Sequence, residues 1–153
     1  MSLLFTPIQL QSPRGALTLP NRIVVAPMCQ YACHLDGKAN DWHLMHWGNL
    51  LNSGAGVFMI EATAVTAQGR ITPNCLGLWD DATANALADT LARARKLAPP
   101  MPVCLQIAHA GRKGSSAQPW HGGMLIPKEN GGWDTVAPSP IHLLDGEEPP
   151  HEI

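Results

Sequence analysis

The sequence has few charged residues and no concentration of either sign. Only 14% of its 153 residues are charged, with 10 basic and 12 acidic side chains and a net charge of −2. No block or stripe of lysine and arginine is present, which argues against a nucleic-acid-binding or anionic-membrane-binding protein. Because 45% of the residues are hydrophobic, the chain is also too apolar for a disordered tail. We therefore expect a globular protein with neither nucleic acid nor membrane as partner.

Long apolar runs and a disulfide framework are also absent. No run approaches the ~20 apolar residues that a membrane-spanning helix needs. The first seven residues lack the basic and long apolar segments of a secretory signal, so we expect a cytoplasmic location. Four scattered cysteines favour reduced thiols. Cys29 and Cys33 lie close together, but no second such pair completes a zinc tetrad, and we expect no metal site.

Glycine and proline divide the chain into two parts of different character. Between residues 114 and 150 they occupy twelve of 37 positions, six each, a density that breaks helices and central strands. This predicts a loop and hairpin excursion, and four apolar side chains in it favour an ordered one: Trp120, Trp133, Val136 and Ile141. We expect residues 1–153 to belong to one domain, with 114–150 as the excursion.

The first part predicts alternating strands and helices. Short β-branched or apolar runs predict strands, and Asn40-Asp41 and Asp80-Asp81 are typical helix N-caps. The β-α-β-α-β order is typical of a parallel sheet. The first strand–helix connection has no G-x-G-x-x-G turn, which favours a (β/α)8 barrel over a dinucleotide-binding fold, although such a barrel takes ~250 residues. The strands are expected at 22–26, 57–60 and 103–107, and the helices at 42–51 and from 80 to about 96.

Reactive side chains follow each expected strand, in residues 27–31, 61–63 and 106–113. Ligands of parallel α/β proteins bind at the carboxyl ends of the strands. Together the segments supply a thiol, a phenol, an amide, an imidazole, a guanidinium and an amine, and no Ser, His and acid share a motif. The set is suited to a flat polar cofactor.

Several residues allow a structural as well as a functional interpretation. Glu61 could be a general base, but its position at a strand end favours a structural hydrogen bond to a neighbouring strand or loop. His43 and His46 could share a metal, but capping or packing near the helix start is favoured. The remaining thiols are assigned to packing or to chance: Cys33, Cys75 and Cys104.

Five motifs then occur in a specific order: Ala26-Pro27-Met28-Cys29-Gln30-Tyr31, Asp41-Trp42-His43, Glu61-Ala62-Thr63-Ala64-Val65, Gly69-Arg70-Ile71 and Gln106-Ile107-Ala108-His109-Ala110-Gly111-Arg112-Lys113. Over almost its whole length the chain resembles the amino-terminal half of the Old Yellow Enzyme family, in the subclass with a cysteine beside the flavin. The resemblance implies an α/β fold, a partial (β/α)8 TIM barrel with the first three strands and two helices. It further implies FMN as cofactor, NADPH or NADH as reductant and an activated alkene as substrate.

The resemblance also implies roles for individual residues. Pro27, Met28 and Cys29 would contact the flavin, Ala62 would lie near its ring system, and Gln106 would hydrogen-bond its pyrimidine side. Cys29 would tune the reduction potential of the flavin. Tyr31 would line the substrate pocket, with Lys113 at its mouth. Cys29 and Tyr31 are therefore the expected catalytic residues. His109 and Arg112 would brace the third strand–helix loop.

The sequence departs from the family by ending at Ile153. The family's paired His/Asn donors, proton-donating tyrosine and phosphate-binding loops all come later. We therefore expect the chain alone to bind FMN weakly and to be inactive, either as a fragment or as one part completed by a carboxyl-terminal partner chain or a homo-oligomer. Two alternatives stay open: a non-catalytic flavin- or partner-binding fragment, and a small thiol- or metal-binding protein using Cys29, Cys33, His43 and His46.

Overall fold

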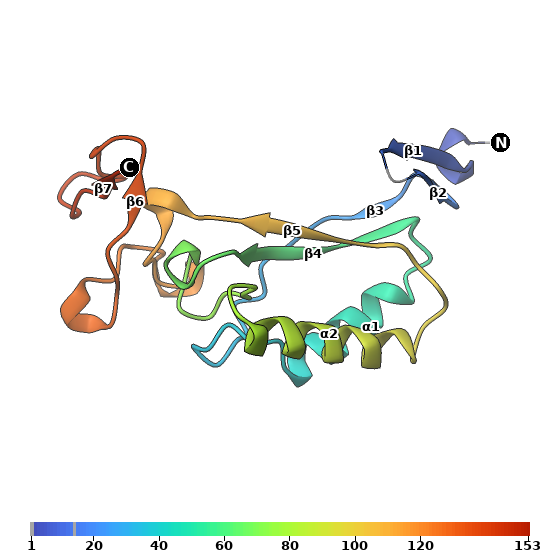
Figure 1. Cartoon of the computed structure of the whole chain (residues 1–153), viewed down its shortest axis with the longest axis horizontal. Helices are drawn as coiled ribbons and strands as arrows, with labels where there is room; N and C mark the ends of the chain where they lie inside the picture. Colours follow the sequence, from blue (N-terminus) through green and yellow to red (C-terminus); the bar gives the residue numbers. More distant parts are fainter. Residues whose placement is uncertain (1, 14) are drawn as a thin grey trace.

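A three-stranded parallel sheet with two helices on one face organises the chain. The computed structural model describes residues 2–13 and 15–153. The strand order is β3-β4-β5, and both pairings are parallel. Both helices lie on the same side of the sheet (Figure 1). The predicted β-α-β-α-β order is confirmed, with β3 at Val24–Val25, α1 at Asp41–Leu51, β4 at Val57–Ala64, α2 at Asp81–Arg95 and β5 at Val103–Ala108.

Both helices begin where their capping residues predict. Asn40 accepts a hydrogen bond from the backbone of Trp42, and the His43 ring accepts one from the backbone of Asn40, which completes a capping box. Asp80 and Thr83 form the equivalent pair at the start of α2. Two of the four unpaired N–H groups at each helix start are thereby satisfied.

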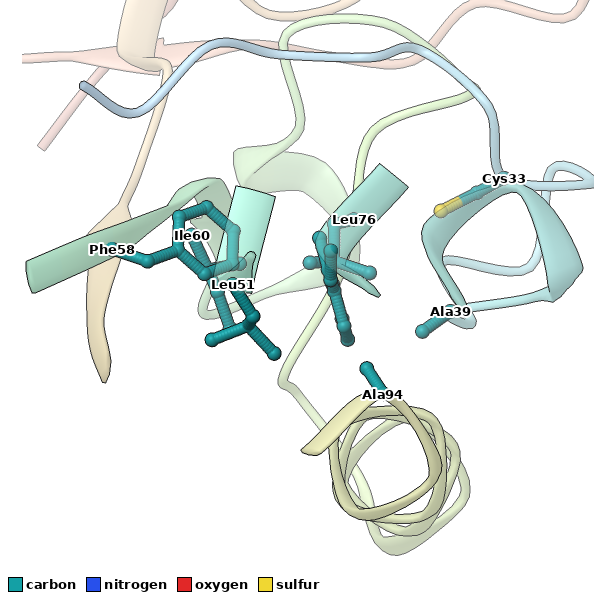
Figure 2. Packing of buried hydrophobic residues seen from close by; sticks show 8 residues of the cluster. Cys33, Ala39, Leu51, Phe58, Ile60, Leu76 and Ala94 are labelled. Carbon is teal, nitrogen blue, oxygen red and sulfur yellow. The ribbon is translucent and has the colours of Figure 1, made fainter. Parts of the chain in front are cut away.

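The core lies between the sheet and the helices. Figure 2 shows Phe58 and Ile60 of β4 packed with Leu51 of α1, and Leu76 lying between the sheet and Ala94 of α2. All of these side chains are at most 2% exposed. Burial on this scale contributes about 1.5–3 kcal/mol for each large apolar side chain. The helix layer therefore fixes the positions of the strands.

The first strand differs from its prediction as a buried strand over 22–26. Ladder pairing is limited to Val24–Val25, and Val24 is 51% exposed. The physical reason is that β3 is an edge strand, paired only with β4 within the described residues. At the other edge Ile107 of β5 is 67% exposed. Hydrophobicity alone does not distinguish an edge strand from a central one.

An antiparallel hairpin precedes the sheet. Strands β1 (Ile8–Ser12) and β2 (Gly15–Leu19) pair in register from Ile8↔Leu19 to Ser12↔Gly15, after a short 3₁₀ turn, η1 (Leu3–Phe5). Alternating apolar and polar residues at 8–11 and 17–19 are the signal for it, although the elements expected above begin only at residue 22. The hairpin lies at the opposite end of the sheet from the carboxyl ends of the strands (Figure 1).

The segment 114–150 is built from turns and short pairings. It contains two 3₁₀ turns, η4 (Pro119–His121) and η5 (Lys128–Asn130), and one antiparallel bridge between Ser116 and Leu125. Strands β6 (Val136–Ala137) and β7 (His151–Glu152) are parallel, so the expected hairpins reduce to that single bridge. Trp120 and Ile141, both expected to pack, are each 62% exposed. The segment lies beyond the carboxyl end of β5, shown in orange and red in Figure 1.

Arg70 joins this segment to the loop that follows β4, which contains η2 (Ala67–Gly69). Its guanidinium lies between the rings of Trp79 and Trp133, 5.3 and 4.9 Å from their centroids. Trp133 Nε1 also donates a hydrogen bond of 2.8 Å to the carbonyl of Gln68. The same guanidinium donates to the carbonyls of Leu35, Ala67 and Pro73 at 2.7–3.0 Å. A planar cation with several donors suits this position better than an ammonium group.

We call the stacking of Arg70 on Trp79 and Trp133, together with its hydrogen bonds to three carbonyls, the Arg70 clamp. Replacing Arg70 with lysine tests it. Arg70→Lys keeps the charge but loses the planar stacking and most of the carbonyl hydrogen bonds, so we expect a loss of about 2 kcal/mol in the free energy of unfolding. Urea unfolding followed by tryptophan fluorescence measures it. Arg95→Lys, at the exposed end of α2, is the matched control and should change stability by less than about 0.5 kcal/mol. Equal effects of the two substitutions would contradict the clamp.

Candidate functional site

The ends of β3 and β4 are tied together by a carboxyl group. The chain turns after β3 through residues 26–31, and the backbone N–H of Gln30 donates a 2.8 Å hydrogen bond to Glu61 Oε2. The thiol of Cys29 lies beside the backbone N–H of Ala62. The predicted structural hydrogen bond from Glu61 to a neighbouring loop is therefore confirmed. Cys29 and Ala62 come together toward the carboxyl end of the sheet.

A bulge in β4 places Ala62 opposite Gln106 of β5. Ile60 pairs with Leu105 and Thr63 pairs with Ile107, so both Glu61 and Ala62 lie opposite the single residue Gln106. An extra residue in one strand redirects its side chains, and such bulges are frequent next to active sites. Here Glu61 lies beside α1, and Ala62 lies between Cys29 and the end of β5. Ala62 and Gln106 thus lie near the carboxyl ends of β4 and β5, and Cys29 lies in the segment that follows the end of β3.

The exposure of these residues leaves a surface that a ligand can reach. Met28 is 68% exposed and Gln106 is exposed, while Pro27, Cys29 and Ala62 are half-buried. Within residues 2–13 and 15–153, the exposed Gln106 amide takes part in no hydrogen bond. A free amide offers one acceptor and one two-proton donor. This donor set fits the edge of a flavin pyrimidine ring, which carries both acceptors and a donor.

Tyr31 and Lys113 line one small cavity. The cavity has a volume of about 180 Å³, and its walls also include Ile71, Ala117 and Leu143. Tyr31 has a left-handed backbone (φ +52°), which is rare for a bulky residue and frequent at functional sites. Its ring meets that of Trp120 edge to face, with centroids 5.6 Å apart. Trp120 is not among the site residues expected from the sequence, since only the folded excursion brings it to Tyr31.

Burial keeps the reactive groups of the site protonated. It raises the pKa of the Cys29 thiol to about 11, with the neighbouring Cys75 and Glu61 as smaller causes. Burial also raises the pKa of Tyr31, with Cys29 as the next cause. Both groups are therefore neutral near pH 7, and Cys29 is not an activated nucleophile.

The loop after β5 is held by the two residues expected to brace it. His109 Nδ1 accepts a 3.1 Å hydrogen bond from the backbone of Gly111, which begins η3 (Gly111–Lys113). Arg112 donates to the carbonyl of Ile141 at 2.6 Å and to the hydroxyl of Ser139 at 2.9 Å. These contacts place Lys113, itself exposed, at the rim of the cavity.

The other titratable residues near the site are structural. His43 belongs to the capping box of α1, as predicted, and Cys33 is packed in the core, as predicted. Cys75 is buried, and its sulfur accepts a hydrogen bond from the backbone of Thr72. In the part of the chain that the structure describes, no three His, Cys, Asp or Glu side chains are placed to hold a metal ion. Among the same residues, none of the helices has the length and apolar character needed to cross a bilayer.

Comparison with known proteins identifies the family. The NADH:flavin oxidoreductase / NADH oxidase family matches residues 3–135. A NADH:flavin oxidoreductase of Gibberella zeae is 43% identical over 148 residues, covering 95% of this chain and 34% of that protein. A NADPH dehydrogenase of Bacillus licheniformis is 41% identical over 125 residues, covering 81% of this chain and 35% of that protein. The chain thus spans about a third of the length of these relatives.

Solved structures show the same fold. Morphinone reductase superposes with a TM-score of 0.72 at 24% identity, over 98% of this chain and 39% of that one. An old yellow enzyme homologue from Zymomonas mobilis superposes with a TM-score of 0.71 at 23% identity, over 99% of this chain and 40% of that one. The three strands and two helices are accordingly a partial TIM barrel, as predicted.

FMN and a nicotinamide nucleotide are the cofactors of the family, and the strand ends described above offer an amide, a thiol and open backbone suited to a flavin. With the match over residues 3–135 and relatives above 40% identity, the chain belongs to the NADH:flavin oxidoreductase / NADH oxidase family, the Old Yellow Enzyme family.

Proposed function

We propose that this chain supplies the amino-terminal, flavin-facing part of an FMN-dependent NAD(P)H oxidoreductase that reduces activated alkenes. The observation that carries the proposal is the convergence of Cys29, Ala62 and Gln106 on three adjacent strand ends. The family match and the name NADPH dehydrogenase of a relative support the reaction class. FMN, when bound, would accept a hydride from NAD(P)H and pass it to the alkene.

Some residues of this chain would contact the cofactor, and others would bind the substrate. The exposed Gln106 amide would hydrogen-bond the pyrimidine side of the flavin, and the backbone at Pro27 and Met28 would contact its edge. Cys29, a neutral thiol, would lie against the ring system without attacking it. Tyr31 and Lys113, on the walls of the 180 Å³ cavity, would bind the substrate. Donors aimed at a reduced flavin stabilise its negative charge.

We also propose that further polypeptide completes the barrel, as a carboxyl-terminal segment, a partner chain or a second copy. The exposed edges at Val24 and Ile107 support this proposal, because open strand edges and apolar edge side chains favour further pairing. It explains why we expect weak flavin binding and no turnover from residues 1–153 alone. The cytoplasmic location expected from the sequence stays a prediction.

Flavin titration of the purified chain tests the proposal. We expect FMN to bind weakly, with quenching of its fluorescence, and Gln106→Leu to weaken binding roughly five- to tenfold through the lost hydrogen bonds. Gln9→Leu on the remote hairpin is the matched control and should leave the dissociation constant unchanged. No change in flavin fluorescence at millimolar FMN, or equal constants for Gln106→Leu and wild type, would contradict the site.

Thiol labelling gives a second test. Since its pKa is raised to about 11, Cys29 should react with iodoacetamide at pH 8 at least about tenfold more slowly than free cysteine. Added FMN should slow the reaction of Cys29 further, whereas Cys104, near the start of β5, serves as the reference thiol and should be unaffected. Peptide mass spectrometry measures both rates. FMN protection that is equal at the two thiols would indicate general stabilisation and not binding beside Cys29.

A further inference from the structure

Glu61 is a buried carboxyl group, and one of its two oxygens has no hydrogen-bond partner among the described residues. The residue is 3% exposed, and Oε2 accepts the hydrogen bond from the Gln30 backbone. Oε1 is fully buried and has no hydrogen-bond partner within the described residues. A buried carboxylate oxygen without a partner costs more than an ordinary unpaired polar group, so a proton on or near Oε1 is the expected remedy.

The group facing that oxygen is an equally buried imidazole. His43 of α1 has no exposed surface, and its Nε2 lies 3.7 Å from Glu61 Oε1 and 3.9 Å from the sulfur of Cys33. Its ring also packs edge to face on Trp47, which fixes the ring orientation. The other nitrogen, Nδ1, lies 3.1 Å from the backbone nitrogen of Asn40 and 3.0 Å from Asn40 Oδ1.

Asn40 can therefore satisfy either tautomer of the imidazole. When Nδ1 is unprotonated it accepts from the backbone N–H of Asn40, and the proton on Nε2 points at an ionised Glu61. When Nδ1 carries a proton it donates to Asn40 Oδ1, and the unprotonated Nε2 faces a protonated Glu61. At 3.7 Å, Nε2 and Oε1 face each other without a hydrogen bond, and in both states one of them carries a proton.

We propose that Glu61 and His43 form a buried proton-holding pair that positions residues 28–31 and sets the charge beside Cys29. The inference about Cys29 as a flavin neighbour rests on the proposed function, but the proton-holding pair itself does not. Glu61 and His43 are positioning residues, since they act through the Gln30 backbone and the Cys29 thiol.

Burial favours the neutral form of each group, so the pair is uncharged between about pH 4 and pH 7. Burial raises the pKa of Glu61 to about 7 and lowers the pKa of His43 to about 4. The titratable and charged groups around the pair are Cys29, Tyr31, Cys33, His34 and Asp36 from the loop after β3, His46 from α1, and Arg70 and Cys75 from the loop after β4. Burial, and not a neighbouring charge, is the largest cause of both pKa shifts. Loss of the proton above pH 7 places a negative charge against the Cys29 thiol.

Carbon-13 NMR of the glutamate carboxyl groups tests the pair in the unaltered chain. The protein has five glutamates, and we expect the Glu61 carboxyl signal to titrate near pH 7. Glu61→Gln should remove the high-pH signal, and Glu129→Gln, on the exposed η5 turn, should remove one of the others. Titration of all five carboxyl groups below pH 5.5 would overturn the proposal. This measurement uses the unaltered chain, so it does not depend on the folding of a variant.

Labelling of Cys29 then tests the coupling to the site. In wild type the logarithm of the iodoacetamide rate should rise by less than one per pH unit between pH 6 and 8, because ionisation of Glu61 raises the thiol pKa. In Glu61→Gln the slope should be one throughout, and the rate at pH 8.5 should exceed wild type by at least about threefold. Identical profiles would overturn the coupling. Neither measurement uses FMN or NAD(P)H, so their outcome is independent of the flavin titration.

The contributions of Glu61 and His43 to the free energy of unfolding change with pH in opposite directions. Glu61, with a raised pKa in the folded state, contributes stability below pH 4.5 that is lost as the pH rises through 7. His43, with a lowered pKa, contributes stability above pH 6.5 that is lost as the pH falls through 4. The two effects oppose each other between pH 4.5 and 6.5. Urea unfolding of Glu61→Gln should therefore show stability that rises with pH over this range more steeply than in wild type, and parallel curves would contradict the proposal.

Discussion

The hydrogen bond from the Gln30 backbone to Glu61 is the contact on which the candidate site depends. It joins the segment after β3, which has no regular secondary structure, to a strand in the centre of the sheet. Because Tyr31 adopts a left-handed backbone in that segment, the local conformation needs support from outside. A buried carboxyl on β4 supplies it, and the Cys29 thiol consequently lies at Ala62.

The remainder of the chain holds this contact in place from two sides. On one side α1 and α2 bury the apolar face of β4, and the capping histidine of α1 reaches Glu61. On the other side the Arg70 clamp holds the glycine- and proline-rich segment, which brings Trp120 to Tyr31. A rigid helix-backed sheet thus carries reactive groups on its strand ends, which is the general arrangement of parallel α/β enzymes.

Local sequence signals predict the elements that local interactions determine. Asn40 and Asp80 place the helix starts correctly because capping involves neighbours three residues apart. The motifs around Cys29, Ala62 and Gln106 identify the family, since each follows a recognisable strand. In contrast, the bulge opposite Gln106, the contact between Tyr31 and Trp120, and the pairing of Glu61 with His43 join residues 18 to 89 positions apart in the chain. No local pattern encodes such contacts, and the exposed edge position of Val24 is missed for the same reason.

The central claim is that three strand ends form one surface for a flavin. Backbone amide NMR of the labelled chain during addition of FMN measures this most directly, because it reports on every strand end at once. The account predicts that the largest shifts occur together at Met28, Cys29, Ala62 and Gln106. Shifts confined to the outer faces of α1 and α2, or to only one of the three strand ends, would contradict it.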